Sequence, residues 1–568
     1  MANLPEKNIT QVDEITSVPA NSKLFVNANG EFRQATVNEV VKSSTVVTSA
    51  VENAINTAVE DGVNSHFKQT TGSPILLTDS ADGTLIDFKA YGRSTQDGEP
   101  TPDNPIAIKS VADGGYFDGE LLQGYYNESG VISSNSSYVC SKNLIPCNSG
   151  DNVKLAYAGK IGSIAFNFYD KDMNVLSRPS NTSEVTEYEA IAPTNAKYVH
   201  FMFREVSETI TPQTSKHITV TINGKYAFIE KSKGKNKLDI TKYKKIGNET
   251  VVINDNTVTI KAGTYSYGIQ FSNADVGLEV GCEYRCSSLT SGVTIQGGWR
   301  LAFKDGTYGN ALGSNVTITI SKEVESILYY IGSPYNGTTD ITISEMQIEV
   351  GAVATDYEPY KEEVKYIPLN EPLRGVGDVR DEVSLNEINR KFAEVVFDGS
   401  SDERWLLSSN CFYINLSDTN IDTSGYCKAL CTHFKNHNVW LDIDGSKVDN
   451  SFTIYRYKDW VNARLAFYTS KIKTGAEWTE WLQANPITVI YELAEPIVET
   501  IEPVDIVTYD NVTYLTASDD ADMELEYPTS KVAGIASIGY SKGRKAEYEV
   551  ELLKAQLLEL QTAMVNSL

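Results

Sequence analysis

Short stretches in which apolar and polar residues alternate occur along most of the chain. In DGTLIDFKAYG, for example, Ile86, Phe88 and Ala90 alternate with more polar neighbours, which is the period of a half-buried β-strand. Stretches of this kind, separated by turn residues, fill residues 114–230, 235–360 and 390–530. Short strands at regular spacing predict β-sandwich or jelly-roll modules. We therefore expect a mainly β, multi-domain chain with one helix near each end.

The N-terminal region combines a hairpin signal with a helical pattern. In residues 1–37, two strand-like stretches flank the dipeptide Asn29–Gly30, which is typical of a β-hairpin. Residues 38–67 instead place small and β-branched residues at helical spacing. One row consists of Val47, Val51, Ala54 and Ala58. We expect an amphipathic helix that packs against copies of itself, with packing on its own domain as the alternative.

Residues 541–568 carry the spacing of a coiled coil. The apolar positions are Val550, Leu553, Leu557, Leu560 and Met564. They alternate three and four residues apart, which is the a/d seam of a heptad repeat. A seam of about two heptads is too short for an isolated coiled coil. We expect a C-terminal oligomerisation helix within an assembly, and the alternative is a helix folded back on its own module.

The third module contains one short helical segment, KTGAEWTEWLQANP. Thr474 and Glu477 have the spacing of a capping box, and Pro486 prevents continuation. Trp478, Trp481 and Leu482 share one face. We expect this helix to cover a sheet with its tryptophan pair in the core, and the alternative is a tryptophan-lined ligand groove.

A proline-rich spacer, RSTQDGEPTPDNP, interrupts two strand-like pieces between residues 87 and 111. We expect the flanking strands to pair far downstream, near GVGDVRDEVSL. Residues 68–113 and 361–389 would then form one discontinuous β support domain, with the two modules between them projecting from it. The prolines Pro102 and Pro105 are expected to form a stiff corner that sets module direction without needing backbone donors.

Composition and charge exclude several classes of protein. Lys and Arg number 49 against 75 Asp and Glu, for a formal net charge of -26, so a nucleic-acid-binding surface is not expected. The chain has no signal-peptide pattern and no run of about 18 apolar residues, so we expect a protein that is made in the cytoplasm and not inserted into membranes. The odd set of seven cysteines is expected to be mostly reduced and buried.

Few residues have the pattern of a catalytic or metal site. The side chains of Cys427, Cys431, His433 and His437 are of the types that bind zinc, but only one residue separates the cysteine pair from the histidine pair. Structural zinc sites usually have a dozen or more residues between their two ligand pairs, so that the chain can wrap around the ion. We expect buried cysteines beside surface histidines. No GxSxG or HExxH motif is present. No catalytic residue, metal or cofactor is therefore predicted.

Two acidic stretches have the residue types of a glycosidase or a calcium site. They are Asp170 with Asp172, and Asp519 with Asp520 and Asp522. Their flanking residues favour a turn between strands for the first and a solvated loop for the second.

Several aromatic residues lie beside polar groups in the second module. They are Trp299 with Arg300, Tyr265 with Tyr267, and Tyr335. Aromatic rings can stack on the C–H faces of sugars while polar side chains bind the hydroxyls. These five residues are the predicted glycan-binding set, and the alternative is that alternate strand residues simply form the core.

Three strings together resemble tail structural proteins from phages and prophages of Gram-positive bacteria. They are LIDFKAYGRSTQDGEPTPDNPIAIKSV, YIPLNEPLRGVGDVRDEVSLNE and WLQANPITVIYELAEPIVETIE. QIEVGAVATDYEPY is similar to the end of carbohydrate-binding jelly rolls, and IAFNFYDKDMNVLS is similar to a sandwich of upper-baseplate proteins. The resemblance covers about residues 70–541. Residues 1–37 are similar to the virion-attachment ends of phage fibres.

The resemblance implies a virion structural protein of the tail-fibre or baseplate type. It implies a homotrimer that contacts other tail or baseplate proteins and binds a host-surface glycan without catalysis. The alternatives are a glycan depolymerase of the tailspike type, and a connector or head fibre that binds no ligand.

Overall fold

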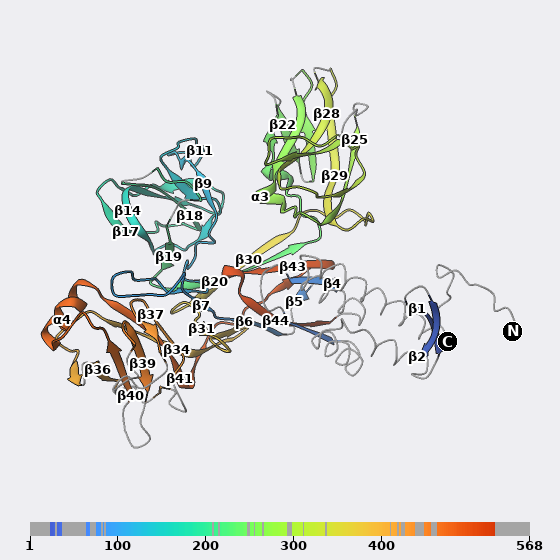
Figure 1. The fold of residues 1–568 in the computed structure, drawn as a ribbon. Helices are drawn as coiled ribbons and strands as arrows, with labels where there is room; N and C mark the ends of the chain where they lie inside the picture. Colours follow the sequence, from blue (N-terminus) through green and yellow to red (C-terminus); the bar gives the residue numbers. More distant parts are fainter. Residues whose placement is uncertain are drawn as a thin grey trace.

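The computed structural model shows a mainly β chain of several domains (Figure 1), as the sequence predicts. It describes residues 23–28, 31–36, 64–68, 75–80, 83–84, 87–206, 209–213, 216–246, 250–254, 256–263, 266–291, 298–310, 312–335, 338–408, 411–416, 420–421, 427–437, 448–455 and 463–528. None of the helices among these residues is long and apolar enough to cross a membrane. None of the seven cysteines forms a disulfide bond, and all except the half-buried Cys282 are buried.

The N-terminal hairpin forms where it is predicted. Strands β1 (Lys23–Ala28) and β2 (Glu31–Thr36) pair in antiparallel register around Asn29–Gly30. The prediction that the helix extends to residue 67 is wrong, because residues 64–68 form strand β3 (Asn64–Lys68) and pair with β44 (Asp522–Pro528). The rest of that helix lies outside the described residues. So does the C-terminal heptad segment with Val550, Leu553, Leu557, Leu560 and Met564.

A support domain is assembled from distant parts of the chain. One sheet contains β6 (Asp87–Tyr91), which pairs with β33 (Glu382–Ser384) on one side and with β44 on the other. The pairing with β33 is the one that the sequence predicts. The facing sheet has the order β30 (Glu362–Leu369), β20 (Tyr226–Gly234), β43 (Asn511–Ala517), β4 (Ile75–Ser80). Three further two-stranded sheets are formed by β5 (Gly83–Thr84) with β42 (Val507–Thr508), β7 (Ser94–Thr95) with β8 (Lys109–Ser110), and β31 (Gly375–Val376) with β32 (Val379–Arg380).

The support domain draws on more of the chain than the predicted segments. Its apolar core contains Phe88 and Val383, but also Phe228 and the late residues Leu515 and Met523. Strand β20 and residues after about 500 therefore belong to this core, and not to the sandwich modules in which the sequence pattern placed them. Short apolar strands give no local sign of which sheet they join.

The first sandwich is built around two long strands. They are β14 (Asn152–Tyr169) and β18 (Tyr198–Glu205). The other strands are β9 (Leu121–Gln123), β10 (Tyr125–Tyr126), β11 (Ile132–Ser133), β12 (Val139–Ser141), β13 (Ile145–Pro146), β15 (Val175–Ser177), β16 (Ser180–Asn181), β17 (Val185–Ile191) and β19 (Ile218–Ile222). Its core includes Ala227 of the support strand β20, and Tyr366 of β30 packs against it. The cores of this sandwich and the support domain therefore meet without a gap.

The second sandwich has two facing sheets. One contains β21 (Lys244–Lys245), β24 (Ser266–Ser272), β28 (Val324–Tyr335) and β26 (Gly298–Phe303). The other contains β22 (Val251–Asn254), β23 (Thr257–Ile260), β29 (Ile341–Val350), β25 (Glu283–Ser291) and β27 (Val316–Thr319). Two short helices, η2 (Ile240–Lys242) and α3 (Asn273–Val276), lie beside them. Every residue of its core cluster falls between Leu238 and Val350.

The third module continues from the support sheet through β34 (Glu387–Phe397) and β41 (Ile487–Thr500). Its remaining elements are β35 (Leu406–Ser408), β36 (Cys411–Leu416), β37 (Ala429–Cys431), β38 (Lys435–Asn436), β39 (Ser451–Tyr455), β40 (Ala463–Tyr468) and α4 (Gly475–Ala484). Helix α4 has the predicted capping box between Thr474 and Glu477. Trp478 is fully buried and stacks on Phe412 with ring centroids 4.7 Å apart. The prediction that this helix covers a sheet is confirmed.

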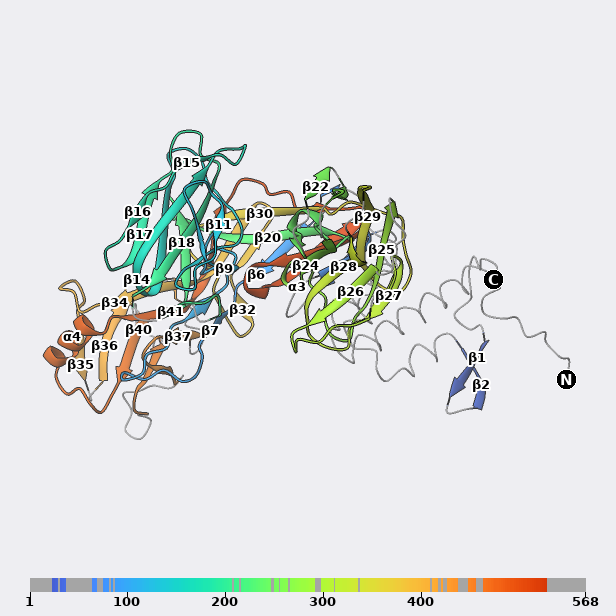
Figure 2. The ribbon, with the colours of Figure 1, turned by 90° about the horizontal axis from the view of Figure 1, so that it is seen from above.

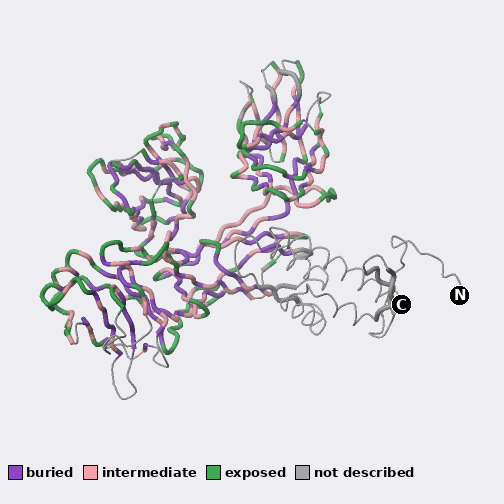
Figure 3. The backbone as a smooth tube through the Cα atoms, in the orientation of Figure 1, coloured by how far each residue is buried: buried purple, intermediate pink, exposed green. Residues whose placement is uncertain are grey.

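The two sandwiches project from the support domain on the same side, and the third module continues from one end of it (Figures 1 and 2). Each module has buried residues at its own centre (Figure 3).

The proline-rich spacer packs on the third module. Gln96 Nε2 donates to the carbonyl oxygen of Cys431 at 3.0 Å, and the N–H of Ile106 donates to the carbonyl oxygen of Thr432 at 2.8 Å. Pro102 is buried whereas Pro105 is exposed. The spacer is therefore a strap between support domain and third module, which agrees with a role in setting module direction.

Pro102→Ala should loosen this strap more than Pro105→Ala. Both changes release the unfolded chain from a ring constraint worth about 0.4–1 kcal/mol, but only Pro102 also loses buried contacts. We expect hydrogen exchange at the Ile106 amide to become several-fold faster in Pro102→Ala than in Pro105→Ala. Equal exchange in the two variants would contradict the strap.

Glu230 on β20 places a carboxyl group inside the support domain. Its side chain is fully buried, and Oε1 accepts a hydrogen bond from Ser232 Oγ at 2.9 Å. Oε2 has no hydrogen-bond partner among the described residues. Burial raises the pKa of Glu230 to about 8, because a charge in an apolar core is costly. The group is therefore protonated at neutral pH.

The pKa of Glu230 predicts a pH dependence of stability. Between its ordinary value of 4.5 and about 8, the unfolded chain binds fewer protons at this site than the folded chain. The free energy of unfolding should therefore fall with rising pH in this window, by about 1.4 kcal/mol per unit. Glu230→Gln should remove this slope, as measured by hydrogen exchange of the β20 amides. Glu363→Gln, on the paired strand, is the control and should keep it.

Candidate functional site

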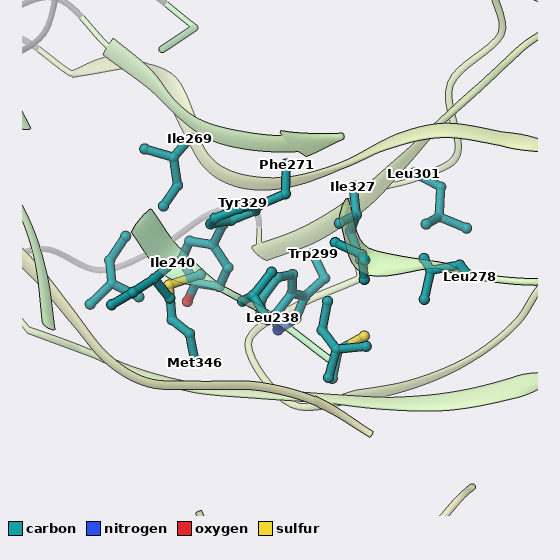
Figure 4. Close-up of a cluster of buried hydrophobic side chains, with 14 of the residues drawn as sticks. Leu238, Ile240, Ile269, Phe271, Leu278, Trp299, Leu301, Ile327, Tyr329 and Met346 are labelled. Carbon is teal, nitrogen blue, oxygen red and sulfur yellow. The ribbon is translucent and has the colours of Figure 1, made fainter. Parts of the chain in front are cut away.

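The predicted pair of Trp299 and Arg300 is split between the two faces of β26. Trp299 is 0% exposed, and its Nε1 donates to the carbonyl oxygen of Ser314 at 3.0 Å. Its ring meets that of Tyr329 edge-on at 5.0 Å, among the buried side chains of Figure 4. Successive residues of a strand point to opposite faces. Trp299 is therefore a core residue, and the prediction that it is a glycan platform is wrong.

Arg300 lies on the opposite face and contacts two tyrosines. Its guanidinium carbon is 4.8 Å from the ring centroid of Tyr308 and 5.7 Å from that of Tyr330, within the range of cation–π attraction. Its Nε donates to the carbonyl oxygen of Gly309 at 2.8 Å. Tyr308 is 58% exposed, and Arg300 and Tyr330 are half-buried. We call Arg300, Tyr308 and Tyr330 the arginine–tyrosine patch.

A tight turn holds Tyr308 next to β26. Asp305 accepts hydrogen bonds from the N–H and Oγ1 of Thr307, at 3.0 and 2.5 Å, and pairs with Lys322 at 3.0 Å. These bonds from Thr307 and Lys322 lower the pKa of Asp305 to about 2, because they favour the charged form. The segment after the turn then runs beside β26, with the N–H of Gly309 donating to the carbonyl oxygen of Leu301 at 2.9 Å.

Gly298 permits this close approach. Its φ is 118°, and a Cβ there would lie 2.2 Å from the carbonyl carbon of Gly313. Only glycine fits such a position. The backbone of β26 and the following segment can therefore lie close enough to bring Tyr308 over Arg300.

The other predicted glycan residues are only partly described. Tyr265 lies outside the described residues, and Tyr267 and Tyr335 are described by backbone alone. The backbones of β24 and β28 pair there, with Ser266 opposite Tyr335 and Gly268 opposite Tyr330. The structure thus brings the ends of these two strands together beside Tyr330.

The patch has the chemistry of a carbohydrate surface. The exposed Tyr308 ring offers an apolar face, and the Arg300 guanidinium offers N–H donors beside it. Tyr308 and Tyr330 were missed by sequence reasoning, although strand alternation in SILYYIG assigns Tyr329 and Tyr330 to opposite faces.

The structure does not bring the cysteine and histidine side chains of residues 427–437 together as a group of metal ligands. Cys427 and Cys431 are buried as expected, and no group of three or more potential ligands for a metal occurs among the residues that the structure describes. His433 is also buried, contrary to expectation, because its ring packs edge-on against Trp481 at 5.5 Å. This burial lowers the pKa of His433.

The two acidic stretches have structural roles. Asp170 is half-buried at a turn, where it accepts hydrogen bonds from the N–H groups of Asp172 and Asn174, both at 2.9 Å. This is the turn that the sequence predicts. Asp522 is not in a solvated loop, because it is buried and paired with Arg380.

Asp519 lines a pocket of about 260 Å³ between the first sandwich and the support domain, together with Asp113 and His217. Asp519 Oδ2 accepts the N–H of Ala112 at 2.7 Å, and Asp113 Oδ2 accepts that of Ser110 at 3.1 Å. Ala112 has a φ of 65°, a conformation that costs energy in a residue with a Cβ. The two carboxylates therefore hold a strained turn, and burial raises the pKa of Asp113.

Comparisons with known proteins give no family. No family model matches the chain, and no curated protein matches it. Solved structures that align include "Structure of infectious bursal disease virus Gx strain", at 9% identity over 88% of this chain and 91% of that chain, with a TM-score of 0.09. Another is "Crystal structure of infectious bursal disease virus VP2 subviral particle", at 8% identity over 92% and 96%, with a TM-score of 0.09. Likeness at this level supports no conclusion about fold or function.

The different burial of Trp299 and Tyr308 predicts different effects on stability. Trp299→Ala should destabilise the second sandwich by about 3–5 kcal/mol, because it leaves a cavity in the core. Tyr308→Ala should cost less than about 1 kcal/mol. Urea denaturation followed by hydrogen exchange in β26 and β28 measures both. A similar loss in the two variants would mean that Tyr308 is a packing residue and not part of a surface site.

Proposed function

We propose that the protein is a phage virion component of the tail-fibre or baseplate type that binds a host-surface glycan without catalysis. The observation that carries this proposal is the arginine–tyrosine patch, an exposed aromatic and cationic surface on a sandwich that projects from a support domain (Figure 1). The sequence resemblance to tail structural proteins supports the same function. A sandwich held away from its base can reach a cell surface while the base contacts other tail proteins.

The patch suits weak, repeated binding. It offers a ring face and a guanidinium on an open surface, and such contacts give modest affinity. Several copies on one particle raise the overall affinity through effective concentration. A homotrimer on a tail therefore binds a repetitive glycan well without a deep pocket in any single subunit.

Arg300→Ala and Tyr308→Ala should weaken binding of the full-length protein to Gram-positive cells and to purified wall polysaccharide. We expect a loss of roughly tenfold or more, since about 1.4 kcal/mol per site is tenfold and several copies multiply the effect. The measurement is cell binding of fluorescently labelled protein. Arg464→Ala is the matched control, because Arg464 lies over the Tyr413 ring at 4.5 Å on the third module.

The outcomes separate the alternatives. Loss of binding in Arg464→Ala alone would move the site to the third module. Release of new reducing ends from wall polysaccharide would make the protein a depolymerase. Failure of the wild-type protein to bind any cell or polysaccharide would favour a connector or head fibre.

A further inference from the structure

The two sandwiches and the support domain meet around a cavity of about 320 Å³, which we call the junction cavity. Lysine and carboxylate side chains from all three parts line it. Lys142 of the first sandwich pairs with Glu120 at 2.8 Å and with Asp275 of helix α3, in the second sandwich, at 2.9 Å. An ion pair therefore connects the two sandwiches directly.

The first sandwich is fixed to the support domain by apolar packing. Its core cluster includes Ala227, and the ring of Tyr116 stacks on that of Tyr366 with centroids 5.8 Å apart. Close-packed apolar contacts of this kind resist relative movement. The first sandwich and the support domain therefore behave as one body.

The second sandwich stands on two chain segments, residues 234–237 and 355–361, which we call the neck. The neck is held by polar contacts: the N–H of Gly234 donates to the carbonyl oxygen of Lys361 at 3.0 Å, and Lys235 pairs with Glu358 at 2.8 Å. Lys237 lies over the Tyr514 ring of the support domain at 4.9 Å. The core cluster of this sandwich contains no residue of the neck or the support strands.

No strand of the first sandwich is hydrogen-bonded to a strand of the second in the described part of the chain. A module with its own closed core, joined through a narrow polar neck, is free to change its angle unless another contact holds it. Away from the neck, the ion pair between Lys142 and Asp275 at the junction cavity is a contact of this kind.

We propose that the ion pair between Lys142 and Asp275 is a latch that fixes the second sandwich against the first, and that its release lets the second sandwich turn about the neck. The proposal goes beyond the proposed function and holds whether or not the patch binds glycan. The latch sets the direction in which the second sandwich, with the arginine–tyrosine patch, points.

The latch lies in a partly buried environment. The side chains of Lys142 and Asp275 are 17% and 16% exposed, so the pair is partly shielded from water and salt, and removal of one partner leaves the other charge partly buried without its partner. Burial alone lowers the pKa of Lys142, but the hydrogen bonds to Glu120 and Asp275 outweigh it and raise the pKa. The amine therefore stays charged at neutral pH.

The test uses the full-length protein with spin labels on introduced cysteines, Lys171→Cys in the first sandwich and Ser321→Cys in the second, both at exposed positions. Pulsed electron resonance measures the distance distribution between them. Lys142→Glu and Asp275→Lys should each broaden this distribution, with the released population rising roughly tenfold or more. The double variant, which exchanges the two charges, should restore the narrow distribution.

Lys154→Glu is the control, because Lys154 pairs with Glu187 at 2.7 Å inside the first sandwich and its reversal changes net charge by the same amount. It should leave the distribution narrow. Unchanged distances in the single variants, or no rescue in the double variant, would overturn the latch.

Discussion

The backbone pairing of β6 with strands from two distant parts of the chain is the constraint on which the rest of the structure depends. On one edge, β6 pairs with β33, almost 300 residues downstream, and on the other edge with β44, more than 400 residues downstream. Phe88 and Ala90 of β6 lie in the support core. Because both edges of β6 are paired, the chain between these strands must leave the sheet and return to it. The sandwiches are formed by the chain segments between these returns.

This arrangement separates rigid from adjustable parts. The first sandwich shares its apolar core with support strands β20 and β30, whereas the second has a closed core of its own and a polar neck. Apolar packing holds parts in one relation, because close-packed side chains have few alternative arrangements. Polar contacts at a narrow neck fix the relative position of two domains less firmly than apolar packing does. The patch of Arg300 and Tyr308 therefore lies on the part whose direction is set by ion pairs.

The region around β26 shows how far local pattern reading reaches. Alternation places Trp299 and Arg300 on opposite faces, but it does not say which face is the core. The buried face receives Tyr329 and the indole hydrogen bond to Ser314. Tyr308 lies on the open face because a turn brings the chain back beside β26. Gly298 allows the backbone of the returning segment to lie close to the backbone of β26. Of the predicted pair, Trp299 therefore belongs to the core, and Arg300 lies on the opposite face of the strand.

The sequence by itself determined the features that depend on neighbours in the chain. These are the mainly β class, the Asn29–Gly30 hairpin, and the capping box of α4 with Trp478 toward the sheet. Each follows from periodicity or turn chemistry within a few residues. Only the tertiary structure decided that β3 is a strand, that residues after about 500 complete the support core, and that Lys142 meets Asp275. Those features depend on partners hundreds of residues apart or on different modules, and no local pattern of hydrophobic and polar residues encodes such a meeting.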